Sequence, residues 1–294
     1  MSSVKNSPDS FHSGPTAING IETNLLPVSD RGTSYGHGLF ESMLYSAGCV
    51  PLWERHRSRL TNDAPLLGLS ISHSLLEENL TTFLALLKGQ SLSDGIIKII
   101  LTAGPGGRGY AAPAKLSTQV ICQFSALPES LIQPRRDGIG LTQCQYRLPA
   151  NPLLAGIKHL NRLDQVLARA EWGDEFADGL MYSQEGLLVE AVSANVFIKS
   201  ADHGWITPTL DQAGVCGVMR GLLLEQLFDR VGLLVSKGNI TPGMIASATE
   251  LFICSSVRGL LPVTEINGIG QWSIGADTKR LQSALVDLYD CYPC

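Results

Sequence analysis

The stretch AGIKHLNRLDQVLARAEW, from Ala155 to Trp172, places a lysine directly in front of an amphipathic helical pattern. Its apolar residues recur at the spacing of one helix face, while its charged residues fall elsewhere. The apolar stripe consists of Leu160, Leu163, Val166, Leu167 and Ala170. Lys158 lies outside this stripe, one residue before the expected helix. A cation at a helix start opposes the helix dipole, so local helix stability does not explain its presence.

Two interpretations of Lys158 follow from its surroundings. Lysines near helix starts are commonly surface residues. A lysine becomes a nucleophile that forms a Schiff base when burial and a positive local potential lower its pKa. The helix N-terminus and the preceding apolar segment LLAGI, at 153–157, provide both conditions. This stretch alone therefore leaves both interpretations open.

The composition indicates a globular protein that acts on small molecules. The chain has 294 residues with 44% hydrophobic content, enough for a large core divided between two domains. Its formal net charge is −5 and its basic residues form no long block, unlike a nucleic-acid-binding protein. It has no apolar run of the roughly 18 residues that a membrane helix needs, and no signal segment near Met1. We therefore expect a cytoplasmic protein with a small-molecule substrate and neither a nucleic-acid nor a membrane partner.

The cysteines indicate reduced thiols. A disulfide framework is not expected with seven cysteines, an odd number, and no signal segment. The motif CYPC, at Cys291 and Cys294, has redox-type spacing. Such a motif lowers a thiol pKa through a helix that starts after its first cysteine, which is not expected here. We interpret CYPC as an inert tail.

Secondary-structure patterns divide the chain into two α/β blocks. Residues 1–16 have the composition of a disordered tail, 17–126 form a small N-terminal α/β domain, 127–138 form a polar linker, and 139–294 form a large C-terminal cofactor-binding domain. In the first domain we expect two strands around the turn at 46–48, helices through Leu60 and at 75–87, and a hairpin of strands at 96–103 and 118–124. In the second we expect a strand near 139–147, strands around the turn at 184–186, and helices after Lys158, Gly217 and Thr241 and at 278–288.

The glycine-rich turn GPGGRG, at 104–109, matches the spacing GxGxxG of dinucleotide-binding folds, and Glu129 follows at a suitable distance. That fold needs a helix after the glycines and a parallel crossover of a dozen or more residues. The short segment between Gly109 and Thr118 is interrupted by Pro113. We therefore expect an antiparallel hairpin and no dinucleotide site.

Further residues suit an imine-forming cofactor such as pyridoxal phosphate. Such a cofactor needs an anion beside its ring nitrogen, and Glu190 is a carboxylate within the apolar segment LLVEAVSANVF at 187–197. The alternative is a solvent-facing glutamate on an edge strand. A phosphate suits the helix that begins after Gly217, with Ser255 and Ser256 as hydroxyl donors.

Six ordered motifs resemble the fold-type IV pyridoxal-phosphate enzymes, a family that includes branched-chain and D-amino acid aminotransferases. The motifs are VSDRGTSYGHGLFESM, RHRSRL, GIKHLNRLDQVLARAE, EGLLVEAVSANVF, LDQAGVCGVMR and ELFICSSVRGLLPV, spanning about residues 18–288. The resemblance implies an α/β (α+β) fold with a small N-terminal domain and a larger C-terminal pseudo-barrel domain. It also implies a pyridoxal 5′-phosphate cofactor and a homodimer.

Residue by residue, the resemblance makes Lys158 the Schiff-base lysine and Glu190 the partner of the pyridine nitrogen. It makes Arg59 the phosphate arginine, a residue that charge patterning alone would treat as a solvated helix arginine. No metal site is implied. The other implied cofactor contacts are the backbone N–H groups of Val218 and Met219 and the hydroxyls of Ser255 and Ser256.

Two stretches, GGRGY at 106–110 and KHLNRLDQVLARAE at 158–171, are more similar to the aminodeoxychorismate lyases of this family than to its aminotransferases. A planar arginine suits a substrate carboxylate, so Arg108 is the candidate clamp, with Tyr110 and His37 as further substrate-binding residues. The sequence departs from the lyase pattern at His37, where aspartate is more usual, and at Ser255, where some relatives carry asparagine.

The resemblance implies a lyase that converts 4-amino-4-deoxychorismate to 4-aminobenzoate and pyruvate in folate biosynthesis. A D-amino acid or branched-chain aminotransferase of the same fold is the alternative, because it would use the same lysine and glutamate. A binding module without catalysis would lack the lysine–cofactor bond.

Overall fold

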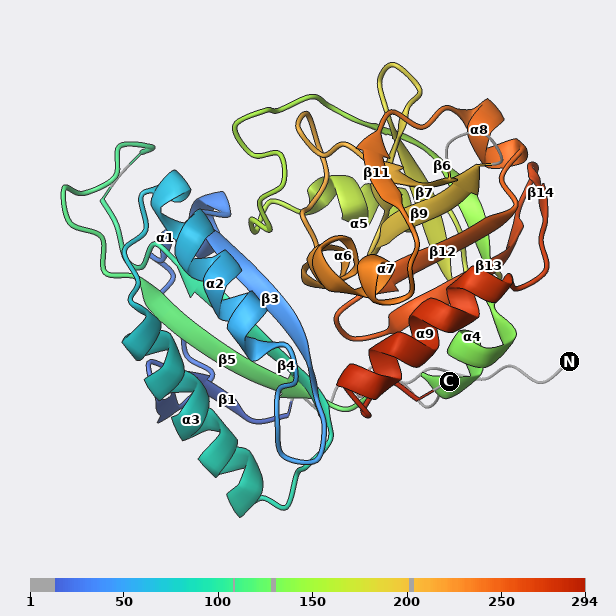
Figure 1. The fold of residues 1–294 in the computed structure, drawn as a ribbon. Coiled ribbons are helices and arrows are strands. Elements are labelled where there is room, and N and C mark those ends of the chain that lie inside the picture. The colour runs from blue at the N-terminus through green and yellow to red at the C-terminus, as the bar shows by residue number, and fades with distance from the viewer. Residues whose placement is uncertain (1–13, 108, 128–130, 201–203, 294) are drawn as a thin grey trace, which may run out of the picture.

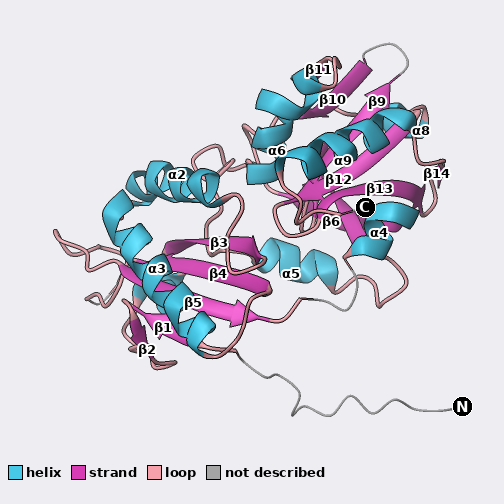
Figure 2. Cartoon of the chain, turned by 60° about the horizontal axis from the view of Figure 1, so that its bottom comes forward, coloured by secondary structure: helices cyan, strands magenta, loops and turns pink. Residues whose placement is uncertain are grey.

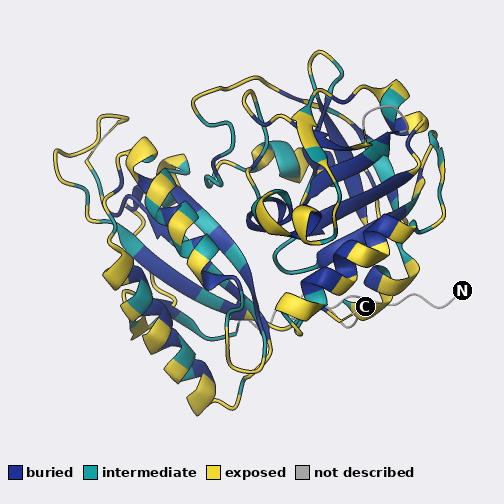
Figure 3. Ribbon diagram, viewed as in Figure 1, coloured by how far each residue is buried: buried dark blue, intermediate teal, exposed yellow. Residues whose placement is uncertain are grey.

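A computed structural model describes residues 14–107, 109–127, 131–200 and 204–293. These residues form two lobes, each built around a β-sheet (Figure 1). Buried side chains concentrate on the sheets and on the inner faces of the helices, whereas the outer helix faces are exposed (Figure 3). No helix in these described ranges is long and apolar enough to cross a membrane.

The first lobe is an antiparallel sheet covered by helices. Across the sheet, its strands are β2 (Ile21–Glu22), β1 (Thr16–Ile18), β5 (Gln119–Ser125), β4 (Gly95–Thr102) and β3 (Gly38–Tyr45). Its helices are α1 (Arg31–Tyr35), α2 (Trp53–Asp63), η2 (Ala64–Leu67) and α3 (His73–Gly89). Helices α2 and α3 lie over the same face of the sheet (Figure 2), where Leu60 and Phe83 join a core with Ile99.

The second lobe contains a larger mixed sheet. Its strand order is β11 (Val235–Gly238), β10 (Gly204–Pro208), β9 (Asn195–Ser200), β12 (Glu250–Ser255), β13 (Gly259–Ile266), β6 (Ile139–Leu148), β7 (Asp178–Ser183) and β8 (Leu188–Ala191), with β14 (Gly270–Gln271) paired to β13. Strand β6 is parallel to both β13 and β7, β10 is parallel to β11, and the other pairs of this sheet are antiparallel. The terminal strand β8 also lies close to β9, so the sheet curls into a half-barrel.

Helices surround this curled sheet. They are α4 (Ile132–Asp137), α5 (Leu163–Arg169), α6 (Val218–Leu222), the π-helical segment η3 (Leu223–Leu227), α7 (Phe228–Arg230), α8 (Pro242–Ala246) and α9 (Ala276–Leu288). Segments α6, η3 and α7 form one helical run that begins after Gly217, as the sequence predicts. The Thr241 hydroxyl caps α8 by accepting from the Met244 N–H at 3.3 Å. The mixed α/β fold class is confirmed.

The expected hairpin around the glycine-rich turn is also confirmed. Strands β4 and β5 pair in antiparallel register, with Ile97 opposite Phe124. The described residues between them contain no helix after the glycines. Glu129, the acidic residue of the dinucleotide pattern, lies outside the described residues.

Three local expectations are wrong. The chain after β3 forms a turn with an isolated bridge between Ser46 and Cys49 rather than a second strand, because the next residues enter α2. The segment 127–138 contains helix α4 and is not a simple linker. The sequence places residue 16 in the tail, but β1 begins at Thr16 because it pairs with β5.

Helix α5 is the largest departure. It begins at Leu163 instead of directly after Lys158, and only Ala168 within it is buried. The predicted apolar stripe is largely exposed, with exposed fractions of 67% at Leu163, 61% at Val166 and 48% at Leu167. The apolar stripe of α5 therefore does not pack into the core of the same chain.

Other expectations fall partly outside the described residues or stay untested. Residues 1–13 and Cys294 are not described, and Cys291 is a free thiol in the structure. The division of the chain into independent domains stays a prediction.

Candidate active site

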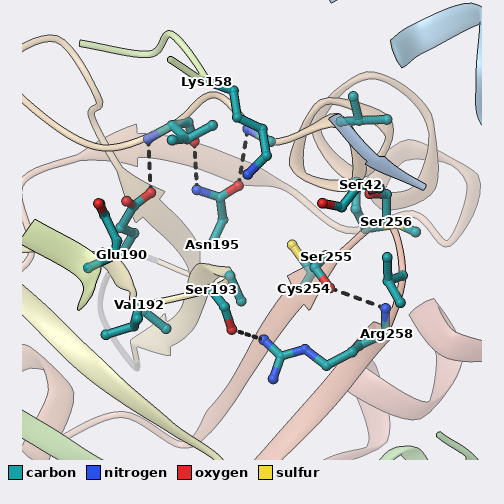
Figure 4. A pocket seen from close by; sticks show the side chains of 18 of the residues that line it. Ser42, Lys158, Glu190, Val192, Ser193, Asn195, Cys254, Ser255, Ser256 and Arg258 are labelled. Atoms are coloured by element: carbon teal, nitrogen blue, oxygen red, sulfur yellow. Dashed lines mark hydrogen bonds between the residues drawn. The ribbon is translucent and has the colours of Figure 1, made fainter. Parts of the chain in front are cut away.

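A pocket of about 470 Å³ lies between the two lobes. Phe40 and Ser42 on β3 and Arg59 on α2 line it from the first lobe, and the curled sheet supplies the rest of its wall. The structure brings together in this pocket every cofactor-binding residue predicted from the sequence: Arg59, Lys158, Glu190, Val218, Met219, Ser255 and Ser256. Figure 4 shows Lys158, Glu190 and the two serines around it.

Lys158 lies on an extended segment that pairs with the start of β3. The Phe40 N–H donates to the Lys158 carbonyl and the Leu160 N–H donates to the Gly38 carbonyl, both at 3.0 Å. A side chain at Gly38 could not be accommodated, because its Cβ would lie 2.1 Å from the Leu101 carbonyl oxygen. These bonds hold Lys158 in the pocket and explain why the helix starts later than predicted.

The Lys158 amine has the character of a nucleophile. Burial, reinforced by the positive charge of Arg59, lowers its pKa to about 8. Its Nζ atom lies 4.3 Å from the centre of the Phe40 ring. A substantial fraction of the amine is therefore neutral near physiological pH, which is the form that attacks a carbonyl carbon.

Glu190 is a buried carboxylate that lines the same pocket. It is 4% exposed, and its Oε2 atom accepts from the Val215 N–H at 2.8 Å. Burial raises its pKa to about 6, although the Val215 N–H and the nearby cations Arg162 and Lys158 act in the opposite direction. A carboxylate has room for several hydrogen bonds, so Glu190 can accept another from a ligand in the pocket.

Arg59 is held in place by a buried carboxylate that the sequence analysis did not identify. Its guanidinium donates to both oxygens of Glu41, with an Nε–Oε1 distance of 2.7 Å, and to the Cys216 carbonyl at 2.8 Å. Glu41 also contacts His56 Nδ1 at 2.6 Å. The positive charge of Arg59 and the contact with His56 lower the pKa of Glu41 to about 2 against the opposing effect of burial. Glu41 therefore fixes the orientation of Arg59.

The wall beside Arg59 is built from a helix start and two serines. The Gly217 N–H donates to Asn195 Oδ1 at 3.1 Å, and a Cβ at Gly217 would lie only 2.0 Å from that atom. The next residues, Val218 and Met219, open the helical run, where N–H groups lack partners within the helix. Such a helix start next to a guanidinium is suited to an anion.

Ser255 and Ser256 both line this wall, but each also has a structural bond. The Ser256 hydroxyl donates to the Ser42 carbonyl at 2.9 Å, which ties the second lobe to β3. The Ser255 hydroxyl accepts from the Arg258 N–H at 3.2 Å (Figure 4). Arg258 in turn donates to Asp178 and Ser193, both at 2.8 Å. This network joins the turn after Glu190 to the turn after β12.

Of the predicted substrate-binding residues, Tyr110 and His37 are described, and neither lines the pocket. Arg108 lies outside the described residues. Tyr110 is 88% exposed, and its carbonyl accepts from Arg31 Nη2 at 2.8 Å. His37 accepts from Arg31 Nε at 3.3 Å and contacts the Leu67 carbonyl at 2.7 Å through Nε2. The substrate roles of Arg108, Tyr110 and His37 stay predictions.

Comparison with known proteins identifies enzymes related to this chain. Residues 38–266 match the family model for amino-transferase class IV. An aminodeoxychorismate lyase from Vibrio harveyi is 34% identical over 276 residues, covering 91% of this chain and 98% of the relative.

Solved structures agree with this family match. A 4-amino-4-deoxychorismate lyase from Pseudomonas aeruginosa superposes with a TM-score of 0.87 and 38% identity, covering 94% of this chain and 99% of the other. A branched-chain amino acid aminotransferase from Escherichia coli shares the fold, with a TM-score of 0.82, 21% identity and 96% coverage of both chains.

Proposed function

The chain belongs to the class IV aminotransferase family, and we propose that within it the protein is the lyase that converts 4-amino-4-deoxychorismate to 4-aminobenzoate and pyruvate. The identities to two lyases over almost the whole chain support this choice. The pocket that unites Lys158, Glu190 and Arg59 supports the cofactor chemistry that lyases and aminotransferases share, so the identities to the two lyases are the observation that carries the choice. Such a reaction would serve folate biosynthesis.

The family cofactor, pyridoxal 5′-phosphate, fits the groups that face this pocket. Its aldehyde needs a reactive amine, its ring nitrogen an anion and its phosphate a cationic site with N–H donors. Lys158, the buried Glu190 and Arg59 meet these needs in turn. The further phosphate contacts would come from the N–H groups of Val218 and Met219 and from the hydroxyls of Ser255 and Ser256, and the Ser256 proton would have to turn from the Ser42 carbonyl to the phosphate. When bound, the cofactor supplies an electron sink for a carbanion next to the substrate amine.

Lys158 is the group that moves protons in the proposed reaction. With a pKa of about 8, its amine can accept the proton from the ring carbon that carries the substrate's amino group. The carbon–oxygen bond to the enolpyruvyl group then breaks, and the ring becomes aromatic. Lys158 can return a proton to the departing enolpyruvate, which leaves as pyruvate. With the cofactor bound, Glu190 would hold the ring nitrogen, and its negative charge would keep that nitrogen protonated.

The test of this function is a product analysis with the purified, cofactor-loaded protein. Incubation with 4-amino-4-deoxychorismate should yield 4-aminobenzoate and pyruvate in equal amounts. A parallel incubation with 2-oxoglutarate and D-alanine or a branched-chain amino acid measures amino transfer. Efficient amino transfer without release of 4-aminobenzoate would refute the lyase and favour the aminotransferase alternative.

Replacing Arg59 by alanine should weaken cofactor retention about ten- to hundred-fold, because one charge-assisted contact is worth about 1.5–3 kcal/mol. The measurement is the dissociation constant of pyridoxal phosphate from the reconstituted protein. Ser256→Ala should have a smaller effect, because a neutral hydroxyl bond is weaker.

Arg57→Ala is the matched control for this measurement. Arg57 lies on the same helix but pairs with Glu54 and Glu77 instead of lining the pocket. Arg59→Lys is a second variant that keeps a positive charge beside the buried Glu41, so it tests the same role with less risk of misfolding. Equal cofactor affinity in Arg59→Ala and Arg57→Ala would remove Arg59 from the phosphate site.

The homodimer is part of the same proposal, and the exposed face of α5 supports it. Leu163, Val166 and Leu167 expose about half or more of their surface on one helix. An exposed apolar cluster of this kind is typical of an interface. Val166→Asp should convert a dimer at micromolar concentration into monomers, as measured by light scattering after size-exclusion chromatography.

Leu234→Asp is the control for the dimer experiment, because Leu234 is 91% exposed and lies outside α5. It should leave the oligomeric state unchanged. A wild-type monomer with full activity would refute the homodimer, and a dimeric Val166→Asp variant would remove α5 from the interface.

A cytoplasmic location also belongs to this proposal. The thiols of Cys122, Cys144 and Cys254 are free and buried, which suits a reducing compartment.

A further inference from the structure

We propose that Arg162 binds a carboxylate of the substrate, an inference that rests on the proposed lyase function. Within the described residues, three guanidinium groups line the pocket: Arg59, Arg162 and Arg258. They differ in what already neutralises them. This difference identifies the group that remains available to an anionic ligand.

Two of these arginines have carboxylate partners. Arg59 is paired with both oxygens of the buried Glu41. Arg258 is paired with the buried Asp178 at 2.8 Å. In the proposed function, Arg59 is also assigned to the cofactor phosphate. Neither arginine is therefore a free cation for the substrate.

Arg162 makes no ion pair with any described residue. Its Nε atom donates to the His159 carbonyl and its Nη2 atom to the Ile157 carbonyl, both at 2.8 Å. A guanidinium has five N–H donors, so these two bonds leave three available. The two carbonyls flank Lys158 in the sequence, and they hold the Arg162 side chain against the segment that presents the reactive amine.

The charge of Arg162 acts directly on the reactive groups of the pocket. It lowers the pKa of Lys158 and favours the ionised form of Glu190. Burial disfavours the charged form of Arg162, and the negative charges of Glu190 and Asp164 offset this only in part, without an ion pair. An arginine stays protonated in proteins, so an incoming anion that accepts from the guanidinium relieves the remaining cost of burial.

The substrate brings suitable anions, because 4-amino-4-deoxychorismate carries one carboxylate on its ring and another on its enolpyruvyl group. A planar carboxylate matches the fork of a guanidinium and can accept two parallel hydrogen bonds. The phenolic oxygen of the cofactor is the other anion that could meet Arg162. A single oxygen uses less of the fork, so the geometry favours the carboxylate.

The experiment compares Arg162→Gln and Arg162→Lys with the wild-type holoenzyme. We expect Arg162→Gln to raise KM for 4-amino-4-deoxychorismate about ten- to hundred-fold, as loss of one charge-assisted pair predicts, with a smaller change in kcat. Arg162→Lys should fall between the two, because an ammonium keeps the charge but loses the fork. The visible absorbance and the affinity for cofactor should stay at wild-type values.

Product inhibition measures the binding of each product separately from the KM and kcat of the variant. The inhibition constant of 4-aminobenzoate reports on the ring carboxylate, and that of pyruvate reports on the other. A rise in either constant for Arg162→Gln supports the proposal and identifies which carboxylate is bound. Arg169→Gln is the matched control, because Arg169 lies on α5 but bonds to the Trp172 and Gly173 carbonyls outside the pocket.

Three outcomes would overturn the role of Arg162. One is a KM and both inhibition constants within two-fold of wild type. Another is a shifted cofactor absorbance with unchanged product affinity, which assigns Arg162 to the cofactor oxygen. The third is a large loss of kcat with unchanged KM, which makes Arg162 a positioning residue for Lys158. Failure of the proposed function itself is distinct, because the wild-type protein would then release no 4-aminobenzoate.

Discussion

Replacing Lys158 by alanine should reduce lyase turnover by about 10⁴-fold or more while leaving the protein folded. The same amine is assigned both to the cofactor and to the two proton transfers, and loss of a nucleophile or of a proton-transfer group has effects of this order. The fold should survive, because the bonds that attach this segment to β3 come from the backbone of Lys158 and Leu160. The measurement is single-turnover release of 4-aminobenzoate.

Borohydride reduction tests the same assignment without turnover. In the wild-type holoenzyme it should attach the cofactor permanently to the peptide that contains Lys158, as identified by mass spectrometry. Lys98→Ala is the matched control, because the Lys98 Nζ atom lies 5.0 Å from the same Phe40 ring but does not line the pocket. Labelling that persists in Lys158→Ala, or that moves to Lys98 in the wild type, would sink the assignment.

The segment around Lys158 also shows how far sequence periodicity reaches. Apolar spacing predicts a helix directly after Lys158, whereas α5 begins at Leu163. Residues 158–160 bond to β3, and a helical conformation would remove those bonds. This pairing is non-local, so the spacing of neighbouring residues does not reveal it. The exposed stripe on α5 has a similar cause, because periodicity identifies an apolar face but not the surface that covers it.

The sequence predicts the reactive groups of the pocket better than the residues that hold these groups in place. Glu190 was identified because a carboxylate in an apolar strand needs a partner. The same reasoning applies to Glu41 in GLFESM, but its partners Arg59 and His56 come from α2 and meet it only after folding. Arg162 gave no signal either, because its role depends on which neighbouring arginines already have carboxylates.

Replacing Glu190 by glutamine should reduce kcat by about 10²- to 5 × 10³-fold, since removing one charged partner of a buried pair costs about 3–5 kcal/mol. Glutamine is nearly the same size and can still accept from the Val215 N–H. It cannot supply the negative charge that keeps the ring nitrogen protonated. The measurement is kcat in cofactor-saturated enzyme, so that weaker cofactor binding does not contribute.

In the cofactor-free protein, the same substitution should increase stability. Burial raises the pKa of Glu190 from its ordinary 4.5 to about 6, which corresponds to about 2 kcal/mol at about 1.4 kcal/mol per pKa unit. The folded state binds the proton of Glu190 more tightly than the unfolded state does. The free energy of unfolding therefore falls as pH rises from 4.5 to about 6, and the full penalty remains at any pH above about 6. Glu190→Gln should therefore raise the free energy of unfolding by up to about 2 kcal/mol at pH 7, and the gain should vanish below pH 4.5. Urea titrations at several pH values measure it, with the exposed Glu175→Gln as the control. A loss of stability at pH 7 that persists unchanged at low pH would contradict this prediction. It would show that the carboxylate contributes to packing and does not carry an uncompensated charge that a cationic ligand would neutralise.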